Sequence, residues 1–418
     1  PTLGQLAIAG VTFLNAWSSP TCSPTRAGLF TGRRSFHHTV YDPSRPNLPF
    51  TETTIAQLLS PVGYPSGLFG KWHLGNPNGV PAGQGPLDFG WDRHYGGIEG
   101  DLSTSYTNWH KVENTNAFIS TNHATRENVT DALTWIRSRG DSNWMATVAF
   151  NASHWVSGGG LPLRLEMPPA AYRVRIDDGG RGTYRSMLEY LDIQLARLLA
   201  GIPPAVMEKT TVIFLGDNGT DSQLGVNHHF SASRSKGSLY EGGVNVPLIV
   251  ADGYGRVHRQ ELTFPLPSSL TARTGRINWP ARFNTNLVQT MDVFATVAAI
   301  ANADSFSGTD SVSLIPYLQQ VTATPQRTNT LAETRTVAWT TCGDRGWNIA
   351  IRDTTHKLHV RNYGSTVESY ELYDLTVDRW ELNNIWNRTN ATFIAIRDTL
   401  RSGIGTELGA SACPKISP

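Results

Sequence analysis

One cysteine stands in a run whose residue types and spacing suit the binding of an anion. The run is Cys22-Ser-Pro-Thr-Arg-Ala-Gly-Leu-Phe-Thr-Gly-Arg, and we predict a helix from Arg26 to Phe30 that ends at Gly32. Cys22 would then lie near the helix N-terminus, where unpaired N–H groups and the positive end of the helix dipole favour negative charge. The alternative interpretation is an ordinary buried cysteine ahead of a helix.

A second run places a lysine and a histidine on one face of an extended segment. It reads Gly63-Tyr-Pro-Ser-Gly-Leu-Phe-Gly-Lys-Trp-His-Leu-Gly75, with Lys71 and His73 two residues apart. Side chains two apart on extended backbone project to the same side. One of the two could hold an anionic oxygen while the other transfers a proton.

A third group of polar residues follows an apolar run that is typical of a strand. Asp217-Asn218-Gly219 comes directly after Val212 to Leu215, and Lys236 follows in the next loop. Ligands of open α/β sheets bind beyond the carboxyl ends of the strands. A carboxylate next to an amide carbonyl offers hard oxygen ligands of the kind that calcium takes, although Asp-Asn-Gly is also a common turn.

The elements that must position these residues alternate along most of the chain. Apolar strand-like runs at Trp144–Phe150, Thr210–Leu215 and Val246–Ala251 are separated by segments such as Tyr184–Ala200, whose apolar residues recur at helical spacing. This alternation predicts an α/β fold, with a large, mostly parallel central sheet flanked by helices.

The pattern changes near residue 320, after which the strand-like runs are shorter. We predict a smaller C-terminal antiparallel sheet plus a helix. The domains would be a catalytic α/β domain over residues 1–322 and an α+β subdomain over 323–418. The predicted elements are the strands Thr336–Thr340, Trp347–Arg352, His356–Val360 and Tyr370–Tyr373 and the helix Ala391–Leu400.

Bulk properties exclude several classes of protein. The 418 residues carry a formal net charge of +1, which gives no electrostatic reason to expect nucleic acid or an acidic membrane as the main partner. The longest apolar stretch, Val288–Ala301, is too short to span a bilayer. Three cysteines do not form a disulfide framework: Cys342 and Cys413 could pair in an oxidising compartment, or all three could be free thiols.

The runs that begin at Cys22, Gly63 and Lys236 resemble, in this order, the signatures of the formylglycine-dependent sulfatase family, which has the alkaline phosphatase superfamily fold. The resemblance implies that a formylglycine-generating enzyme oxidises Cys22 to formylglycine and that the protein binds calcium. Two positions depart from the usual pattern: Thr25 stands where the family usually has serine, and Ser153-His154-Trp155 lacks the proline that the family often has near this histidine.

The same resemblance assigns roles to individual residues of this chain. Arg26 and calcium would hold the nucleophile derived from Cys22. Lys71, Lys236 and His154 would bind the oxygens of a sulfate ester, with His154 as the acid for the leaving group and His73 assisting the release of sulfate. Asp217 and Asn218 would be two of the metal ligands. The implied function is hydrolysis of an aryl or carbohydrate sulfate ester.

One departure concerns the other half of the metal site. The family provides two adjacent aspartates upstream of the cysteine signature, but here the first aspartate is Asp42 and the first glutamate is Glu52. We therefore expect an upstream strand and loop that end in an acidic pair, behind a secretion signal, in a secreted or periplasmic protein. The alternatives are a phosphate or phosphonate ester hydrolase on the same fold, and a non-catalytic relic that binds sulfated glycan.

Overall fold

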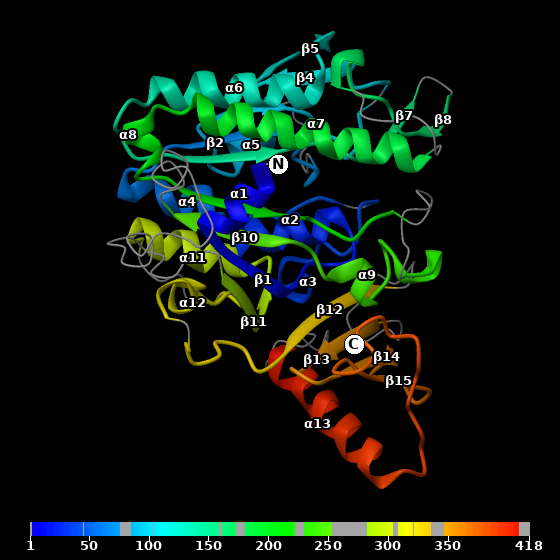
Figure 1. Ribbon diagram of the computed structural model, residues 1–418. Helices are drawn as coiled ribbons and strands as arrows, with labels where there is room; N and C mark the ends of the chain where they lie inside the picture. Colours follow the sequence, from blue (N-terminus) through cyan, green and yellow to red (C-terminus); the bar gives the residue numbers. More distant parts are fainter. Residues whose placement is uncertain are drawn as a thin grey trace.

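A computed structural model describes residues 2–44, 46–75, 85–102, 104–158, 161–172, 180–221, 230–252, 282–303, 308–320, 322–335 and 347–408. Within these ranges the chain forms two larger sheets, a third sheet near the C-terminus and a two-stranded ribbon. Figure 1 shows helices packed above and below the two larger sheets and the C-terminal sheet set to one side. The predicted α/β class is confirmed.

The first larger sheet contains the strand that leads to Cys22. Its order is β11-β1-β10-β9, with β1 parallel to β11 and β10 antiparallel to both β1 and β9. Three of its strands therefore point the same way and β10 is reversed. The strands are β1 (Gly10–Trp17), β9 (Thr211–Leu215), β10 (Leu248–Asp252) and β11 (Arg282–Gln289).

The second larger sheet contains the strand that leads to Lys71. Its order is β5-β4-β3-β2-β6, in which β2 is parallel to β3 and to β6, while β4 and β5 form an antiparallel edge. The strands are β2 (Ser66–Gly70), β3 (Arg93–Gly96), β4 (Trp109–Glu113), β5 (Asn116–Ser120) and β6 (Met145–Ala149). The ribbon of β7 (Val156–Gly158) and β8 (Leu161–Arg164) follows β6.

Helices cover both faces of these sheets and bury the apolar residues of the strands. On one face α1, α6 and α7 share an apolar cluster with Phe69 of β2 and Ile249 of β10. On the other face α2, α4 and α11 pack around Leu68 of β2. These helices are α1 (Thr2–Ala9), α2 (Cys22–Thr31), α4 (Ile55–Leu59), α6 (Ala124–Ser138), α7 (Gly180–Gly201) and α11 (Asp292–Ala301).

Short helices connect the longer elements. They are α3 (Ser35–His38), η1 (Ser60–Val62), α5 (Gly85–Asp88), η2 (Ala170–Tyr172), α8 (Pro204–Met207), η4 (Ala232–Arg234), α9 (Glu241–Val244) and α12 (Ile315–Gln319). No helix in the described part of the chain is both long and apolar enough to cross a membrane.

The C-terminal sheet is antiparallel, as predicted, and one helix packs on it. Its elements are β12 (Thr330–Arg335), β13 (Trp347–Arg352), β14 (His356–Tyr363), β15 (Ser369–Asp374) and α13 (Ala391–Leu408). The predicted strand Thr336–Thr340 lies outside the described residues, as do Cys342 and Cys413. The domain boundary at residue 322 stays a prediction.

Two local features differ from the expectation. The helix predicted from Arg26 begins at Cys22, because Pro24 falls in the first turn, where its missing N–H costs no helical hydrogen bond. The strands of the core lie in two sheets, and β10 runs against its neighbours. β10 pairs antiparallel with both β1 and β9. An apolar run in the sequence indicates a strand but not the direction in which that strand pairs.

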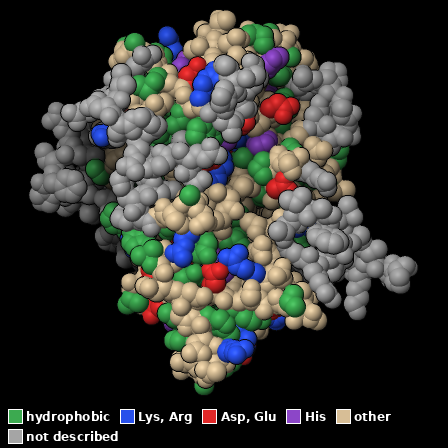
Figure 2. Space-filling model, turned by 90° about the vertical axis from the view of Figure 1, so that its right-hand side faces the viewer, with side chains coloured by type: hydrophobic (Ala, Val, Ile, Leu, Met, Phe, Trp, Pro, Cys, Tyr) green, Lys and Arg blue, Asp and Glu red, His purple; other side chains and the backbone are tan. Residues whose placement is uncertain are grey.

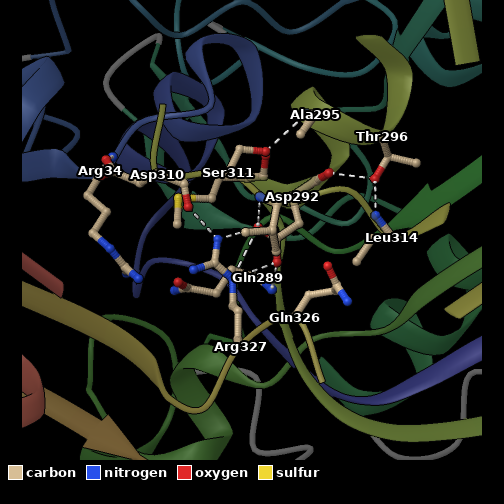
Figure 3. A network of polar contacts seen from close by, with 12 residues as sticks. Arg34, Gln289, Asp292, Ala295, Thr296, Asp310, Ser311, Leu314, Gln326 and Arg327 are labelled. Atoms are coloured by element: carbon tan, nitrogen blue, oxygen red, sulfur yellow. Dashed lines mark hydrogen bonds and ion pairs between the residues drawn. The ribbon is translucent and has the colours of Figure 1, made fainter. Parts of the chain in front are cut away.

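A buried ion pair joins α11 to the segment that leads into β12 (Figure 3). Asp292, fully buried at the start of α11, accepts hydrogen bonds from the backbone N–H groups of Gln289 (2.8 Å) and Val312 (3.0 Å) and from Arg327 Nε (2.9 Å). The Arg327 guanidinium makes a second contact with Asp292 and one with the Asp310 carbonyl. This network fixes the end of β11, and thereby β1, in place.

We expect Asp292→Ala to lower the free energy of unfolding by about 3–5 kcal/mol, because it leaves the buried Arg327 charge without its partner. Glu189→Ala is the matched control, since Glu189 pairs with Arg185 one turn away on the outside of α7 and should cost about 0.5 kcal/mol or less. Equilibrium urea denaturation measures both. Equal, small losses would contradict the structural role of Asp292.

Candidate active site

The predicted site residues come together where four strands end. β1, β2, β6 and β9 all have their carboxyl ends on one side of the molecule. The following loops carry Cys22, Lys71 and His73, His154, and Asp217, respectively. On the face shown in Figure 2, basic, acidic and histidine side chains lie close together in a hollow.

Cys22 is the first residue of α2 and is buried. Its Sγ lies 3.2 Å from Nδ1 of His73, and the Ser23 hydroxyl donates to the His73 carbonyl at 2.9 Å. Gly32 ends the helix in the left-handed conformation, as predicted. The helix N-terminus therefore lies directly against the loop that follows β2.

Arg26 connects three loops of the site. One terminal nitrogen donates to the Lys71 carbonyl at 2.7 Å, and the other donates to Oδ2 of Asp217 at 3.1 Å. Because Arg26 lies on the second turn of α2, it holds the Cys22, Lys71 and Asp217 segments at a fixed separation.

The charged groups in the site shift one another's pKa values. Burial is the main cause that lowers the pKa of Lys71, with Arg26 and Lys236 adding repulsion. Burial alone would raise the pKa of Asp217, but Arg26, Lys71 and Lys236 together hold it at about 2. Asp217 is thus ionised at physiological pH and lies within electrostatic reach of three cations, which attract a further anion.

His73 is held in an unusual environment. Its backbone has a positive φ of 56°, and its ring lies against Gly100, where an added Cβ would come within 2.3 Å of a ring atom. Burial, followed by repulsion from Lys71 and Arg26, lowers the pKa of His73 to about 3. The ring is therefore neutral at physiological pH.

His154 lies at the rim of the site, beside an aspartate that sequence reasoning missed. Its Nδ1 is 3.0 Å from Oδ1 of Asp101 and 3.2 Å from the Trp155 carbonyl. The negative charge of Asp101 also acts on His73. The only sequence signal for Asp101 is the glycine-rich segment Gly96-Gly-Ile-Glu-Gly100 before it, which follows β3.

Lys236 is positioned by close approach of glycines. Its backbone N–H donates to the Thr220 carbonyl at 3.0 Å, in the loop after Asp217. A Cβ on Gly219 would lie 1.9 Å from the Gly242 carbonyl oxygen, so a side chain there would push the two loops apart.

The loop after Lys236 is anchored to the C-terminal sheet. Glu241, at the start of α9, is 3.1 Å from Nζ of Lys357, which is fully buried and also lies 3.0 Å from Glu381. The backbone N–H of Glu241 donates to Glu381. The C-terminal sheet thus supports the loop after Lys236 through a buried ionic network.

Asp217 and Asn218 fit part of a cation site. Oδ1 of Asn218 is buried and has no hydrogen-bond partner among the described residues, which is costly unless another group or ion contacts it. Asp217 provides an ionised carboxylate beside it. Across the described ranges, no group of three or more His, Cys, Asp or Glu residues could hold a metal, so these two would need further oxygen ligands.

Comparisons with known proteins point to one family. A family model described as Sulfatase matches residues 1–303. Arylsulfatase G of Homo sapiens is 28% identical over 353 residues, which are 72% of this chain and 60% of that relative. The chain spans 42% and 62% of the length of two other curated arylsulfatases that it matches.

Solved structures share the fold. The structure of Ps i-CgsB in complex with k-i-k-neocarrahexaose superposes with a TM-score of 0.73 at 20% identity, covering 99% of this chain and 92% of that one. A phosphonate monoester hydrolase from Silicibacter pomeroyi gives a TM-score of 0.67 at 16% identity, covering 97% and 89%.

We expect Gly100→Ala to displace the His73 ring toward solvent and to raise the pKa of His73 from about 3 toward its ordinary value. The control is Gly97→Ala, because a Cβ there has nothing within 4 Å. An NMR titration of the histidine ring signals measures both variants. An unchanged His73 titration in a folded Gly100→Ala protein would contradict the contact.

Proposed function

Because this chain belongs to the sulfatase family, we propose that the complete protein hydrolyses an aryl or carbohydrate sulfate ester. The observation that carries the proposal is the placement of Arg26, which donates to the Lys71 carbonyl at 2.7 Å and to Asp217 at 3.1 Å from the helix that begins at Cys22. Such preorganised positive charge stabilises the negative charge that grows on the sulfate oxygens during reaction.

Conversion of Cys22 to formylglycine would supply an oxygen nucleophile that regenerates after each turnover. Lys71 and Lys236 bind the sulfate oxygens. A protonated His154, paired with Asp101 through Nδ1–H, would give its Nε2 proton to the leaving alcohol oxygen as the nucleophile forms its bond to sulfur and the ester S–O bond breaks. The neutral His73, 3.2 Å from the sulfur of Cys22, takes a proton from the group at position 22 when sulfate departs.

Calcium is the metal that we propose for Asp217 and Asn218. A calcium ion there would contact the unpartnered Oδ1 of Asn218. It would also neutralise negative charge on oxygens at position 22. These two residues would need further oxygen ligands to complete the site. A formylglycine-generating enzyme during maturation and a secreted or periplasmic location are further parts of this proposal, and both rest on the family resemblance.

Experiments can distinguish sulfate ester hydrolysis from two alternative functions. Phosphonate ester hydrolysis is favoured by the likeness to the Silicibacter pomeroyi enzyme. A phosphonate monoester carries one negative charge, as a sulfate ester does, whereas a phosphomonoester carries up to two at neutral pH, so rates on matched sulfate, phosphonate and phosphate esters separate these reactions. A relic that only binds sulfated glycan has no chemical need for the Cys22–His73 contact.

We expect Lys71→Ala and Lys236→Ala each to reduce turnover of an aryl sulfate by about a hundredfold or more in the complete protein, because each removes charge stabilisation. Lys209→Ala, exposed at the opposite end of β9, should leave turnover unchanged. The assay uses matched aryl sulfate and aryl phosphate esters, with calcium and after its removal by EDTA. Faster turnover of the phosphate ester, or calcium-independent activity, would overturn the corresponding part of the proposal.

We also expect mass spectrometry of the peptide that contains residue 22 to show an aldehyde when the protein is produced with its maturation enzyme. Cys22→Ala, made in the same host, provides the unmodified reference. The mechanism requires the oxidised residue, because a thiol cannot be regenerated through a hydrate. An active preparation with only a thiol at position 22 would refute it.

A further inference from the structure

The backbone of His154 is held at both of its polar groups. Its N–H donates to the carbonyl of Asn151 at 2.7 Å, and its carbonyl accepts from the hydroxyl of Tyr106 at 3.0 Å. Tyr106 lies between β3 and β4, 48 residues earlier in the chain. Its hydroxyl is therefore a second contact from this segment to His154, in addition to the contact of Asp101 with the imidazole ring.

The ring of Tyr106 is fixed by packing that does not involve its hydroxyl. The side chain is 1% exposed and belongs to an apolar cluster with Trp109 of β4, Val156 of β7 and Met187 of α7. It also lies against the ring of His123, with the ring centroids 5.3 Å apart. A phenylalanine ring fills the same space, so the exchange of Tyr106 for phenylalanine removes the hydroxyl and little else.

The backbone around Tyr106 is joined to the ribbon of β7 and β8. The N–H of Tyr106 donates to the carboxylate of Glu166, which follows β8. Arg164 of β8 donates to the carbonyl of Thr104 at 2.8 Å. Because the ribbon begins just after His154, the segment of Tyr106 and the segment of His154 are held together on both sides of the hydroxyl contact.

The chemistry of this contact runs in one direction. Burial, followed by repulsion from Glu166, raises the pKa of Tyr106 well above its ordinary value. The hydroxyl therefore keeps its proton at physiological pH, and the carbonyl of His154 can only accept. Without this donor, the partly buried carbonyl would lose its bond or move to find another.

We infer that Tyr106 is a positioning residue for His154. Its hydroxyl fixes the backbone that carries the imidazole ring, while Asp101 fixes the rotation of the ring through Nδ1. The two contacts together determine where Nε2 lies. The inference rests on the proposed function, in which His154 gives its Nε2 proton to the leaving oxygen. Such a transfer needs the two atoms about 3 Å apart, so a small displacement of the ring weakens it without altering the charges that bind sulfate.

The leaving group of the substrate distinguishes this role from a general loss of stability. Phenyl sulfate releases a basic phenolate that needs a proton, whereas 4-nitrophenyl sulfate releases a weak base that needs little help. In the complete protein, we expect Tyr106→Phe to lower kcat about tenfold for phenyl sulfate and about twofold or less for 4-nitrophenyl sulfate. KM should stay nearly the same for both esters, because Lys71 and Lys236 are unchanged.

Tyr317→Phe is the matched control. Tyr317 is fully buried in a different apolar cluster, and its hydroxyl accepts a hydrogen bond from the backbone N–H of Gln326. This variant also loses a buried hydroxyl, so it should affect the two esters equally or not at all.

A double-mutant cycle tests whether Tyr106 acts through His154. In a His154→Gln background, Tyr106→Phe should cause no further loss of phenyl sulfate turnover, because the acid that the hydroxyl positions is already absent. Multiplication of the two separate losses would show that Tyr106 acts independently of His154.

NMR provides a reading of the contact that does not require activity. The ring signals of His154, assigned by their disappearance in His154→Gln, should shift in Tyr106→Phe and stay in place in Tyr317→Phe. Unchanged His154 signals in folded Tyr106→Phe, equal losses on the two esters, or independent effects in the cycle would each overturn the inference. Failure of the proposed function has a different signature: the complete wild-type protein would hydrolyse neither ester, while the NMR comparison would still test the contact.

Discussion

The guanidinium of Arg26 is the contact on which the arrangement of the site depends. It reaches from α2 to the backbone after β2 and to the carboxylate after β9, so strands from two different sheets are held at one helix terminus. Backbone bonds along each sheet fix the strands within that sheet. At the candidate site, the Arg26 contacts join the two sheets together with the contacts of Cys22 and Ser23 to His73.

This connection concentrates positive charge. Three cations and one carboxylate in a partly buried hollow leave an excess of positive charge that water solvates poorly, so an anion of suitable size relieves the repulsion. Burial, with added repulsion from Lys71 and Arg26, keeps the neighbouring His73 neutral. The proposed binding of an anionic ester and the proposed proton transfer both depend on this electrostatic arrangement.

The sequence alone locates most of the site because its residues fall in short continuous runs. Cys22, Lys71 and Asp217 are each preceded or followed by a strand or helix that is visible as an apolar pattern, and strand ends meet at one edge. The sequence does not indicate Asp101, because this residue lies in a glycine-rich loop without an apolar pattern. Only the tertiary structure places its carboxylate against His154. The reversal of β10 and the division of the core into two sheets depend on long-range pairing, which no local pattern encodes.

The buried contact between Glu241 and Lys357 has a consequence for how this architecture can vary among related proteins. Lys357 is fully buried between Glu241 and Glu381, so none of the three can be exchanged alone without stranding a charge. The C-terminal sheet is therefore not an interchangeable module. It can diverge at its exposed positions and in α13, but Lys357 on β14, Glu381 and the loop after Lys236 must be inherited as a matched set.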